Sequence, residues 1–263
     1  MELYFSYVAI GVISGTFAGL LGLGGGLVVV PALTFLFFSR GYGSEHAIHI
    51  AAGTSLATIM VTSLSSTYAH NKRGGVLWGV AKKIFPGILL GALIGVFLAN
   101  SIPENLLQVF FGLFEIFVAC KVFLKTPTQK FSSPPSAGWK FFWGGSLIGT
   151  VSSMLGVGGG TFIVPFLLWF RVSIRKAIGT AAACGFPLAS AGCVGFIISG
   201  WNVKGLPASC VGYVDVTSFI FISFATLFSV PFGARMAYVL PVKALRIIFS
   251  GVLFFLGLGM LLL

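Results

Sequence analysis

Long apolar segments separated by short polar ones follow one another along almost the whole chain. They form two sets of five, at 5–22, 27–38, 46–69, 76–99 and 103–124 and then at 141–157, 161–171, 174–199, 208–232 and 243–262. The longer segments reach the roughly 20 residues that a helix needs to cross a bilayer. The strict alternation typical of membrane strands is missing. The pattern therefore predicts an all-α polytopic membrane protein, whose backbone polar groups pair within helices.

Composition supports a membrane protein and excludes a soluble one. Hydrophobic residues make up 57% of the 263 residues and charged residues only 8%, whereas a soluble domain of this size carries about 25% charged residues. The amino terminus, MELYFSYVAI, lacks the basic start of a secretion signal, and we expect it to be part of the fold. The lipid bilayer is thus the first expected partner.

A glycine-rich motif occurs twice, with the same spacing of glycine and proline. Residues 15–33 read GTFAGLLGLGGGLVVVPAL and residues 149–167 read GTVSSMLGVGGGTFIVPFL. Three consecutive glycines end the first apolar part of each copy, and a short apolar run with a proline follows. Because glycine favours unusual backbone angles and weakens helices, each copy predicts a broken or re-entrant helix. The chain is then two repeats, 1–125 and 140–263, joined by a polar linker at 126–139.

The distribution of basic residues distinguishes two possible topologies. If each broken unit crosses the membrane once, nine Lys and Arg lie on one side and seven on the other. If each unit enters and returns, 14 lie on the linker side, and only Arg40 and Lys204 lie opposite. The positive-inside rule favours the second arrangement. It predicts two inverted repeats of about five helical segments, with both termini outside and the linker in the cytoplasm. Topology also explains the net charge of +11 without a nucleic-acid partner.

The glycine breaks are the strongest candidates for a substrate site. A broken helix leaves N–H groups unpaired at the start of the following half-helix, where the helix dipole also favours an anion. In transporters built from inverted repeats, such breaks meet near the bilayer midplane. The candidate residues at the breaks are Gly24, Gly25, Gly26, Leu27, Gly158, Gly159, Gly160 and Thr161. The alternative is that small residues only permit close helix packing, which applies to Gly11, Gly15, Gly19, Gly22, Gly87, Gly91 and Gly95.

The third segment of each repeat adds polar side chains. Thr54 and Ser55 in the first repeat, and Cys184 and Gly185 in the second, lie nearest the repeat axis by alignment, and we predict that they line the site. Hydroxyl groups in membrane helices also bond to their own backbone or across helices, and this reading stays open. A nucleotide loop is excluded, because neither glycine motif has the required spacing or a following lysine.

Few ionisable residues lie within the predicted spans. Glu115 is a carboxylate deep in an apolar segment, which makes it a candidate proton-coupling group, and Arg235 is a candidate gating residue on the cytoplasmic side. His46 and His49 have no third ligand nearby in sequence, so we predict no metal site, and no cofactor is implied. Asp215 is expected to be solvated near the outer surface. Ser101 and Glu104 are expected to form a capping box.

Three further stretches extend the motif into a family resemblance. AAGTSL at residues 51–56, LPASCVGYVD at 206–215 and PFGARMAYVLPVKALRIIF at 231–249 accompany the two glycine blocks. Together they resemble the TauE/SafE family, also called the sulfite exporter or TSUP family. The resemblance implies transport of sulfur-containing anions such as sulfite, organosulfonates or thiosulfate, and a place in the bacterial inner membrane. ACGF at 183–186 aligns with GTSL at 53–56, so the repeats differ chemically.

The hypothesis from sequence is therefore a permease, not an enzyme, that alternates around an anion site at the midplane. Two alternatives remain. One is a passive anion channel. The other is a membrane-embedded sulfur-transfer enzyme that uses Cys184 or Cys193.

Overall fold

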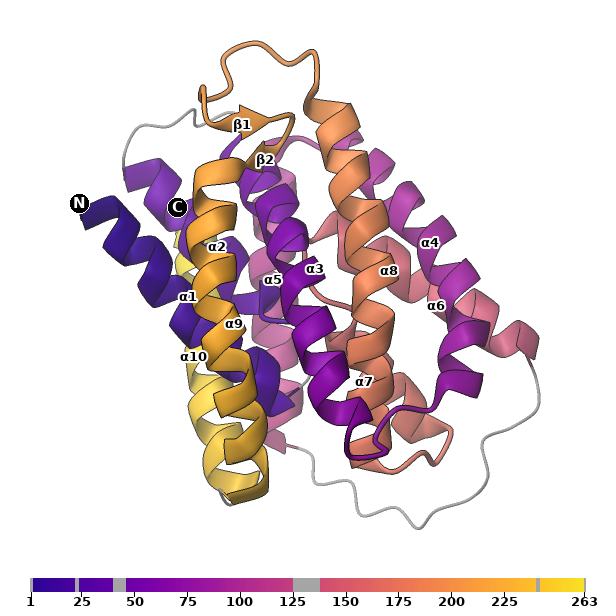
Figure 1. Ribbon diagram of the computed structural model, residues 1–263. Helices are drawn as coiled ribbons and strands as arrows, with labels where there is room; N and C mark the ends of the chain where they lie inside the picture. Colours follow the sequence, from indigo (N-terminus) through magenta and orange to yellow (C-terminus); the bar gives the residue numbers. More distant parts are fainter. Residues whose placement is uncertain (1, 22–23, 40–45, 125–137, 240–241, 263) are drawn as a thin grey trace.

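The computed structural model describes residues 2–21, 24–39, 46–124, 138–239 and 242–262. Residues 126–137 of the predicted linker, Arg40 and two residues next to the first break, Gly22 and Leu23, lie outside the described residues. The last two residues of the predicted linker, 138 and 139, begin a helix. The described chain forms ten helices and one small hairpin (Figure 1). The helices are α1 (Glu2–Leu21), α2 (Gly26–Ser39), α3 (Ala47–Asn71), α4 (Trp78–Ser101), α5 (Glu104–Leu124), α6 (Gly138–Met154), α7 (Gly160–Trp169), α8 (Ile174–Gly200), α9 (Val216–Val239) and α10 (Val242–Leu262). The all-α polytopic prediction is confirmed.

Each predicted apolar segment corresponds to one helix, but the fourth segment of the second repeat was predicted wrongly at its start. Helix α9 begins at Val216, and the residues before it form strands β1 (Cys210–Val211) and β2 (Val214–Asp215), which pair antiparallel. Pro207 removes a backbone donor, and Gly205 and Gly212 have positive φ angles of 86° and 56°. These backbone features end the helical pattern although the residues are apolar.

The helices that follow the two breaks are too short to span a bilayer. Helix α2 has 14 residues and α7 has 10, which correspond to roughly 21 and 15 Å at about 1.5 Å per residue. The hydrocarbon core is about 30 Å thick. By contrast, five described helices are long and apolar enough to cross it, namely α1, α3, α4, α8 and α9.

The two repeats run in opposite directions. Gly11, Gly15 and Gly19 of α1 meet successively later residues of α9, so these helices are parallel. Gly87, Gly91 and Gly95 of α4 likewise meet successively later residues of α6. Figure 1 shows α9 running away from the hairpin end and α4 running toward it. The first helices of the repeats, α1 and α6, are therefore antiparallel, as the basic residues predicted.

The repeats are intertwined rather than packed as separate units. Helix α1 lies against α9, and α6 lies against α4, so the first helix of each repeat packs on the fourth helix of the other. Helices α3 and α8 also contact each other, as do α5 and α10. In the pair α1 and α9 and in the pair α4 and α6, glycine lets the two backbones touch. This confirms the packing interpretation for the described glycines of α1 and α4.

The described basic residues gather at the end of the bundle opposite the hairpin. Their positions follow from the helix ends at which they lie (Figure 1). The group comprises Lys72, Arg73, Lys82, Lys83, Lys121, Lys140, Arg171, Arg175, Lys176 and Arg235, and α10 also begins at this end. Lys204 precedes the hairpin at the other end. We call these the linker end and the hairpin end.

Candidate functional site

The structure brings the two glycine breaks into direct contact. A Cβ atom placed on Gly24 would lie 3.2 Å from Cα of Gly158, and one placed on Gly26 would lie 2.7 Å from the carbonyl oxygen of Gly156. Gly24, Gly25 and Gly156 have positive φ angles of 77°, 83° and 64°, which L side chains rarely adopt. Glycine is therefore required here both by the backbone angle and by the close approach.

Helix α3 holds the two breaks together. The hydroxyl of Ser55 donates to the carbonyl of Gly156 at 2.7 Å, and the hydroxyl of Thr62 donates to the carbonyl of Gly24 at 3.1 Å. Ile59 lies between these two hydroxyls along the helix and contacts the positions of Gly24 and Gly26. Ser55, Ile59 and Thr62 are spaced by four and three residues and so lie on one helix face. Thr62 was missed among the candidate residues, although this spacing was present in the sequence.

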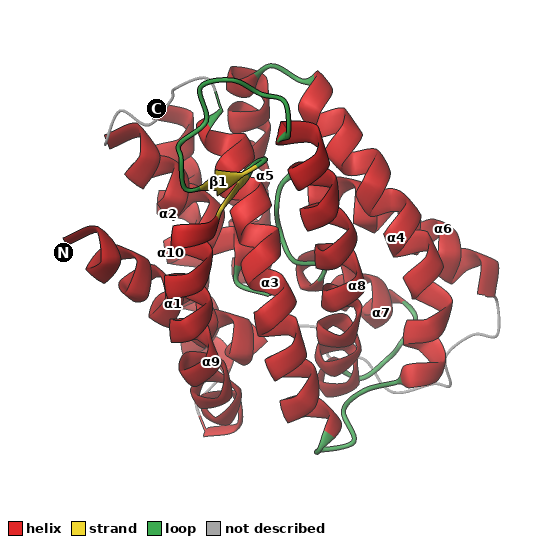
Figure 2. Cartoon of the chain, turned by 45° about the horizontal axis from the view of Figure 1, so that its top comes forward, coloured by secondary structure: helices red, strands yellow, loops and turns green. Residues whose placement is uncertain are grey.

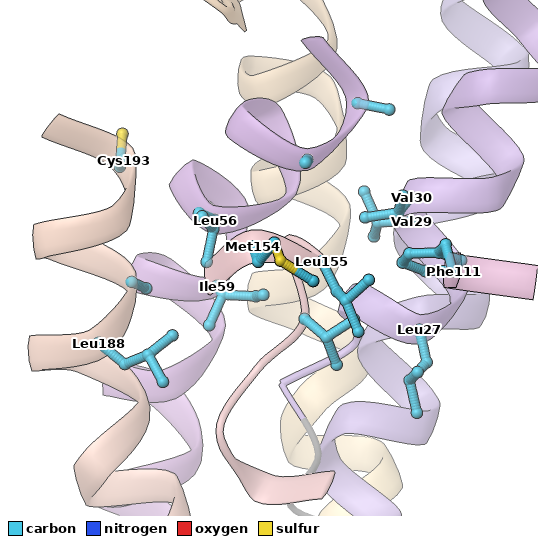
Figure 3. Close-up of a cluster of buried hydrophobic side chains, with 14 of the residues drawn as sticks. Leu27, Val29, Val30, Leu56, Ile59, Phe111, Met154, Leu155, Leu188 and Cys193 are labelled. Atoms are coloured by element: carbon cyan, nitrogen blue, oxygen red, sulfur yellow. The ribbon is translucent and has the colours of Figure 1, made fainter. Parts of the chain in front are cut away.

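An apolar cluster surrounds the contact. Figure 3 shows Leu56 and Ile59 of α3 near Met154 and Leu155 of the second break, with Leu27 of α2 in the same cluster. Leu27 is 1% exposed, so this candidate is a core residue. Cys184 is also fully buried in this core. Neither side chain lines the cavity described next.

A small cavity lies beside the breaks. It is lined by residues of both breaks, α3 and α8, namely Gly24, Ile59, Ser63, Ser66, Gly158, Gly159, Gly160, Ala181, Ala182 and Gly185. The cavity measures about 10 Å³, which is roughly the space that one water molecule needs. Five of the predicted residues therefore line it: Gly24, Gly158, Gly159, Gly160 and Gly185.

Several hydrogen-bond donors near the cavity have no partner among the described residues. The hydroxyl of Ser66 lines the cavity and that of Thr161 lies in the first turn of α7, and both are buried and unpaired. The amides of Gly159 and Gly160 donate to no described backbone or side-chain acceptor. Unpaired buried donors are costly, so this group is suited to an acceptor-rich ligand.

Thr54, unlike Ser55, points to another part of the molecule. Its hydroxyl oxygen accepts a hydrogen bond of 2.9 Å from the amide of Asp215 in the hairpin. The amide of Tyr213 donates to the carbonyl of Phe196 on α8 at 3.2 Å. The hairpin thus binds both α3 and α8 and covers their ends (Figure 2). In this conformation Thr54 attaches the hairpin to α3, and its predicted place in the substrate site stays a prediction.

The cavity and the hairpin lie on opposite sides of the breaks. Ser63 and Ser66 follow Ser55 along α3, toward the linker end, and Ala181 and Gly185 lie in the half of α8 that begins at that end. The hairpin packs so closely that a Cβ atom on Gly53 would lie 2.3 Å from the carbonyl oxygen of Tyr213. The described conformation is therefore closed at the hairpin end.

The two ionisable candidates do not contact the cavity. Glu115 is fully buried in α5, and neither of its carboxyl oxygens has a hydrogen-bond partner in the part of the chain that the structure describes. A Cβ atom on Gly257 of α10 would lie 3.1 Å from Cβ of Glu115. Arg235 is exposed on α9. Their coupling and gating roles stay predictions.

At the hairpin end, Glu104 lies close to His46 and His49. Nδ1 of His49 lies 2.9 Å from one oxygen of Glu104, and the other oxygen accepts from the amide of Ile48 at 2.6 Å. Glu104 therefore does not close the capping box expected with Ser101, whose hydroxyl donates to Phe97. His46 lies near enough for the three ligand atoms to fall within 4.8 Å of one another.

The contacts of His49 indicate a structural role. Its Nε2 lies 3.1 Å from the carbonyl of Ala99. Because a carbonyl can only accept, Nε2 carries a hydrogen, and Nδ1 and Glu104 share another proton. Burial and then the charge of Glu104 raise the pKa of the neighbouring Tyr213. The pair ties the start of α3 to α4 and α5.

Asp215 differs from its prediction, because it is buried rather than solvated. Its side chain is 3% exposed. One carboxyl oxygen accepts from the amide and the hydroxyl of Ser218 at the start of α9. The hairpin carries it inward, which no local pattern indicated.

Comparison with known proteins agrees with this architecture. The family described as sulfite exporter TauE/SafE matches residues 7–260. A probable membrane transporter protein of Haemophilus influenzae is 33% identical over 90% of both chains. One from Methanocaldococcus jannaschii is 28% identical over 97% of this chain and 94% of its own, and YunE of Bacillus subtilis is 31% identical over 73% of this chain and 78% of its own. No solved structure matches significantly. The chain therefore belongs to the sulfite exporter TauE/SafE family and is an integral membrane transporter.

Proposed function

We propose that this transporter carries a small sulfur-containing anion, such as sulfite, an organosulfonate or thiosulfate, through the contact between the two glycine breaks. The observation that carries the proposal is the group of unpaired donors beside that contact: the amides of Gly159 and Gly160 and the hydroxyls of Ser66 and Thr161. The positive end of the α7 dipole points to the same place. No ionisable side chain is among the described residues that line the cavity.

The proposed mechanism is alternating access. A cavity of about 10 Å³ is too small for a sulfur oxyanion, because it holds roughly one water. Binding therefore needs α3 and α8 to separate, which opens the cavity toward the linker end. The inverted repeats supply the opposite movement, in which the hairpin leaves α3 and α8 and the linker end closes.

Removal of the unpaired hydroxyls tests the anion site. In the double variant Ser66→Ala and Thr161→Val, we expect exchange of ³⁵S-sulfite across proteoliposomes to fall at least about tenfold, which corresponds to about 1.4 kcal/mol of lost binding. The fold should persist, because neither hydroxyl bonds to a described residue. Exchange is measured rather than net flux, so the result does not depend on the direction of transport.

Binding to the purified protein gives a separate readout. A ligand of the folded state raises the unfolding temperature, so sulfite or thiosulfate should stabilise the parent protein and not the double variant. Stabilisation by cations alone would contradict the anion site.

Changing Cys184 and Cys193 to serine should leave sulfite exchange in place. If the cysteine variant loses both sulfite exchange and a thiol-dependent reaction, the sulfur-transfer enzyme is favoured. Unitary currents through the parent protein would favour the channel.

We also propose that Glu115 binds the coupling proton. An unpaired carboxylate ion is costly inside a membrane protein, and both oxygens of Glu115 lack hydrogen-bond partners among the described residues. In Glu115→Gln, sulfite exchange should continue, but a pH gradient should no longer drive its accumulation. The control is the parent protein, measured in parallel at each pH. Unchanged proton-driven accumulation in the variant would refute this role.

The orientation that we propose places the hairpin end outside and the linker end in the cytoplasm of a bacterial inner membrane. The basic residues at the linker end support it. In a background with Cys120→Ser and Cys210→Ser, which removes the two thiols that are not buried, a cysteine at position 133 of the linker should not react with an impermeant thiol reagent in intact cells. A cysteine at position 204 should react. The reverse pattern would mean that the protein is inserted the other way.

A further inference from the structure

A second cavity, separate from the glycine breaks, lies at the hairpin end. It measures about 190 Å³ and is lined by residues of α1, α2, α3, the hairpin and α9. The lining residues include Tyr4, Tyr7, Phe37, Cys210, Thr217 and Asp215. At about 30 Å³ for each water molecule in the liquid, this is room for a small organic ligand.

The carboxyl group of Asp215 has one bound and one unpaired oxygen. Ser218 donates to Oδ2 from its amide, at 3.1 Å, and from its hydroxyl. Oδ1 is buried and has no hydrogen-bond partner among the residues that the structure describes. Among the described residues, no lysine, arginine or histidine forms an ion pair with it. A carboxylate that is 3% exposed and keeps one oxygen unpaired needs a positively charged or hydrogen-donating partner.

Other features of the cavity define the chemistry of that partner. Three aromatic residues and one carboxylate-bearing residue line the cavity, and cations bind over the faces of aromatic rings. Asp215 also acts on the thiol of Cys210, another lining residue. Burial, and then the charge of Asp215, raise the pKa of Cys210 to about 12. The single carboxylate among the lining residues matches one positive charge.

We propose that the cavity at the hairpin end is a binding site for a small organic ammonium ion. Asp215 supplies the negative charge that pairs with the cation, and Tyr4, Tyr7 and Phe37 supply aromatic surface in the lining. This site is independent of the proposed anion site, which lies on the other side of the glycine breaks.

Cys210 provides a reporter within the cavity. In a Cys120→Ser background, which removes the exposed thiol, Cys210 should react with a trimethylammonium-bearing methanethiosulfonate faster than with a sulfonate-bearing one. Relative to a free thiol, the ratio of the two rates should be raised about tenfold, since a charged cleft concentrates the opposite charge. Tetramethylammonium chloride should slow the reaction, and sodium chloride at equal ionic strength should not.

Asp215→Asn is the main variant, because its side-chain oxygen can still accept from Ser218. It should return the rate ratio to that of a free thiol and abolish protection by tetramethylammonium. Glu104→Gln, at the same end but outside the cavity, should change neither. Tyr4→Leu replaces a ring that is 46% exposed and should weaken the protection while keeping the rate ratio, which tests the site even if Asp215→Asn fails to fold. Equal protection by sodium chloride, or protection that persists in Asp215→Asn, would overturn the proposal.

Discussion

Replacement of Gly156 by alanine is expected to abolish sulfite exchange. A Cβ atom at this position would lie 2.5 Å from Cα of Ala52, so the second break could not stay against α3. The φ angle of 64° adds a strain of roughly 1–2 kcal/mol for an L residue, and overpacking adds roughly 1–3 kcal/mol. Exchange in proteoliposomes and the unfolding temperature in detergent measure the two effects.

Gly74→Ala is the matched control for Gly156→Ala. Gly74 has almost the same φ angle, 63°, but a Cβ atom there would meet nothing within 4 Å. It should therefore lower the unfolding temperature slightly and leave exchange near the parent rate. If both variants lose exchange equally, backbone strain rather than the contact between the breaks and α3 is the cause.

Replacement of Gly91 by alanine is expected to destabilise the fold itself. A Cβ atom on Gly91 would lie 2.0 Å from the carbonyl oxygen of Ser146, which is backbone and cannot rotate away. Helices α4 and α6 would have to separate, at a cost of roughly 1–3 kcal/mol or more. We expect a markedly lower unfolding temperature and a lower yield of monodisperse protein in size-exclusion chromatography.

Gly79→Ala is the control on the same helix. A Cβ atom there would meet nothing within 4 Å, and alanine favours helix over glycine by roughly 0.5–1 kcal/mol. Its unfolding temperature should be unchanged or slightly raised. Gly19→Ala, in the related pair of α1 and α9, should behave like Gly91→Ala, because its Cβ atom would lie 2.1 Å from the carbonyl oxygen of Val230. A tolerated Gly91→Ala would mean that α4 and α6 are not packed this closely.

The helices could be predicted from the sequence because the bilayer constrains the length and polarity of each segment separately. Apolar length, the breaks at the glycine triplets and the distribution of basic residues are all properties of short stretches. The one segment with a wrong start, 208–232, shows the limit of this reasoning. Residues 210–215 are as apolar as a helix, but their backbone groups pair within a hairpin and with α3 and α8.

Site residues were harder to predict because they depend on which helix face meets the breaks. Thr54 and Ser55 are neighbours in sequence, but Thr54 binds the hairpin and Ser55 binds Gly156. By their helical spacing, Thr62 and Ser66 lie on the same face of α3 as Ser55. Only the position of the breaks in the folded protein shows that this face contacts them. The partners of Glu104 and Asp215 are His49 and Thr54, which lie more than 50 residues away along the chain. No local pattern could indicate these contacts.

The sequence by itself determined that this protein is an all-α membrane protein of two inverted repeats with paired glycine breaks, because hydrophobic length, backbone freedom and charge are local. Only the tertiary structure decided that the repeats are intertwined, that Ser55 and Thr62 hold the breaks together and that the hairpin closes one end. The reason is that these features depend on contacts between distant segments, such as the bond between Ser55 and Gly156, 101 residues apart.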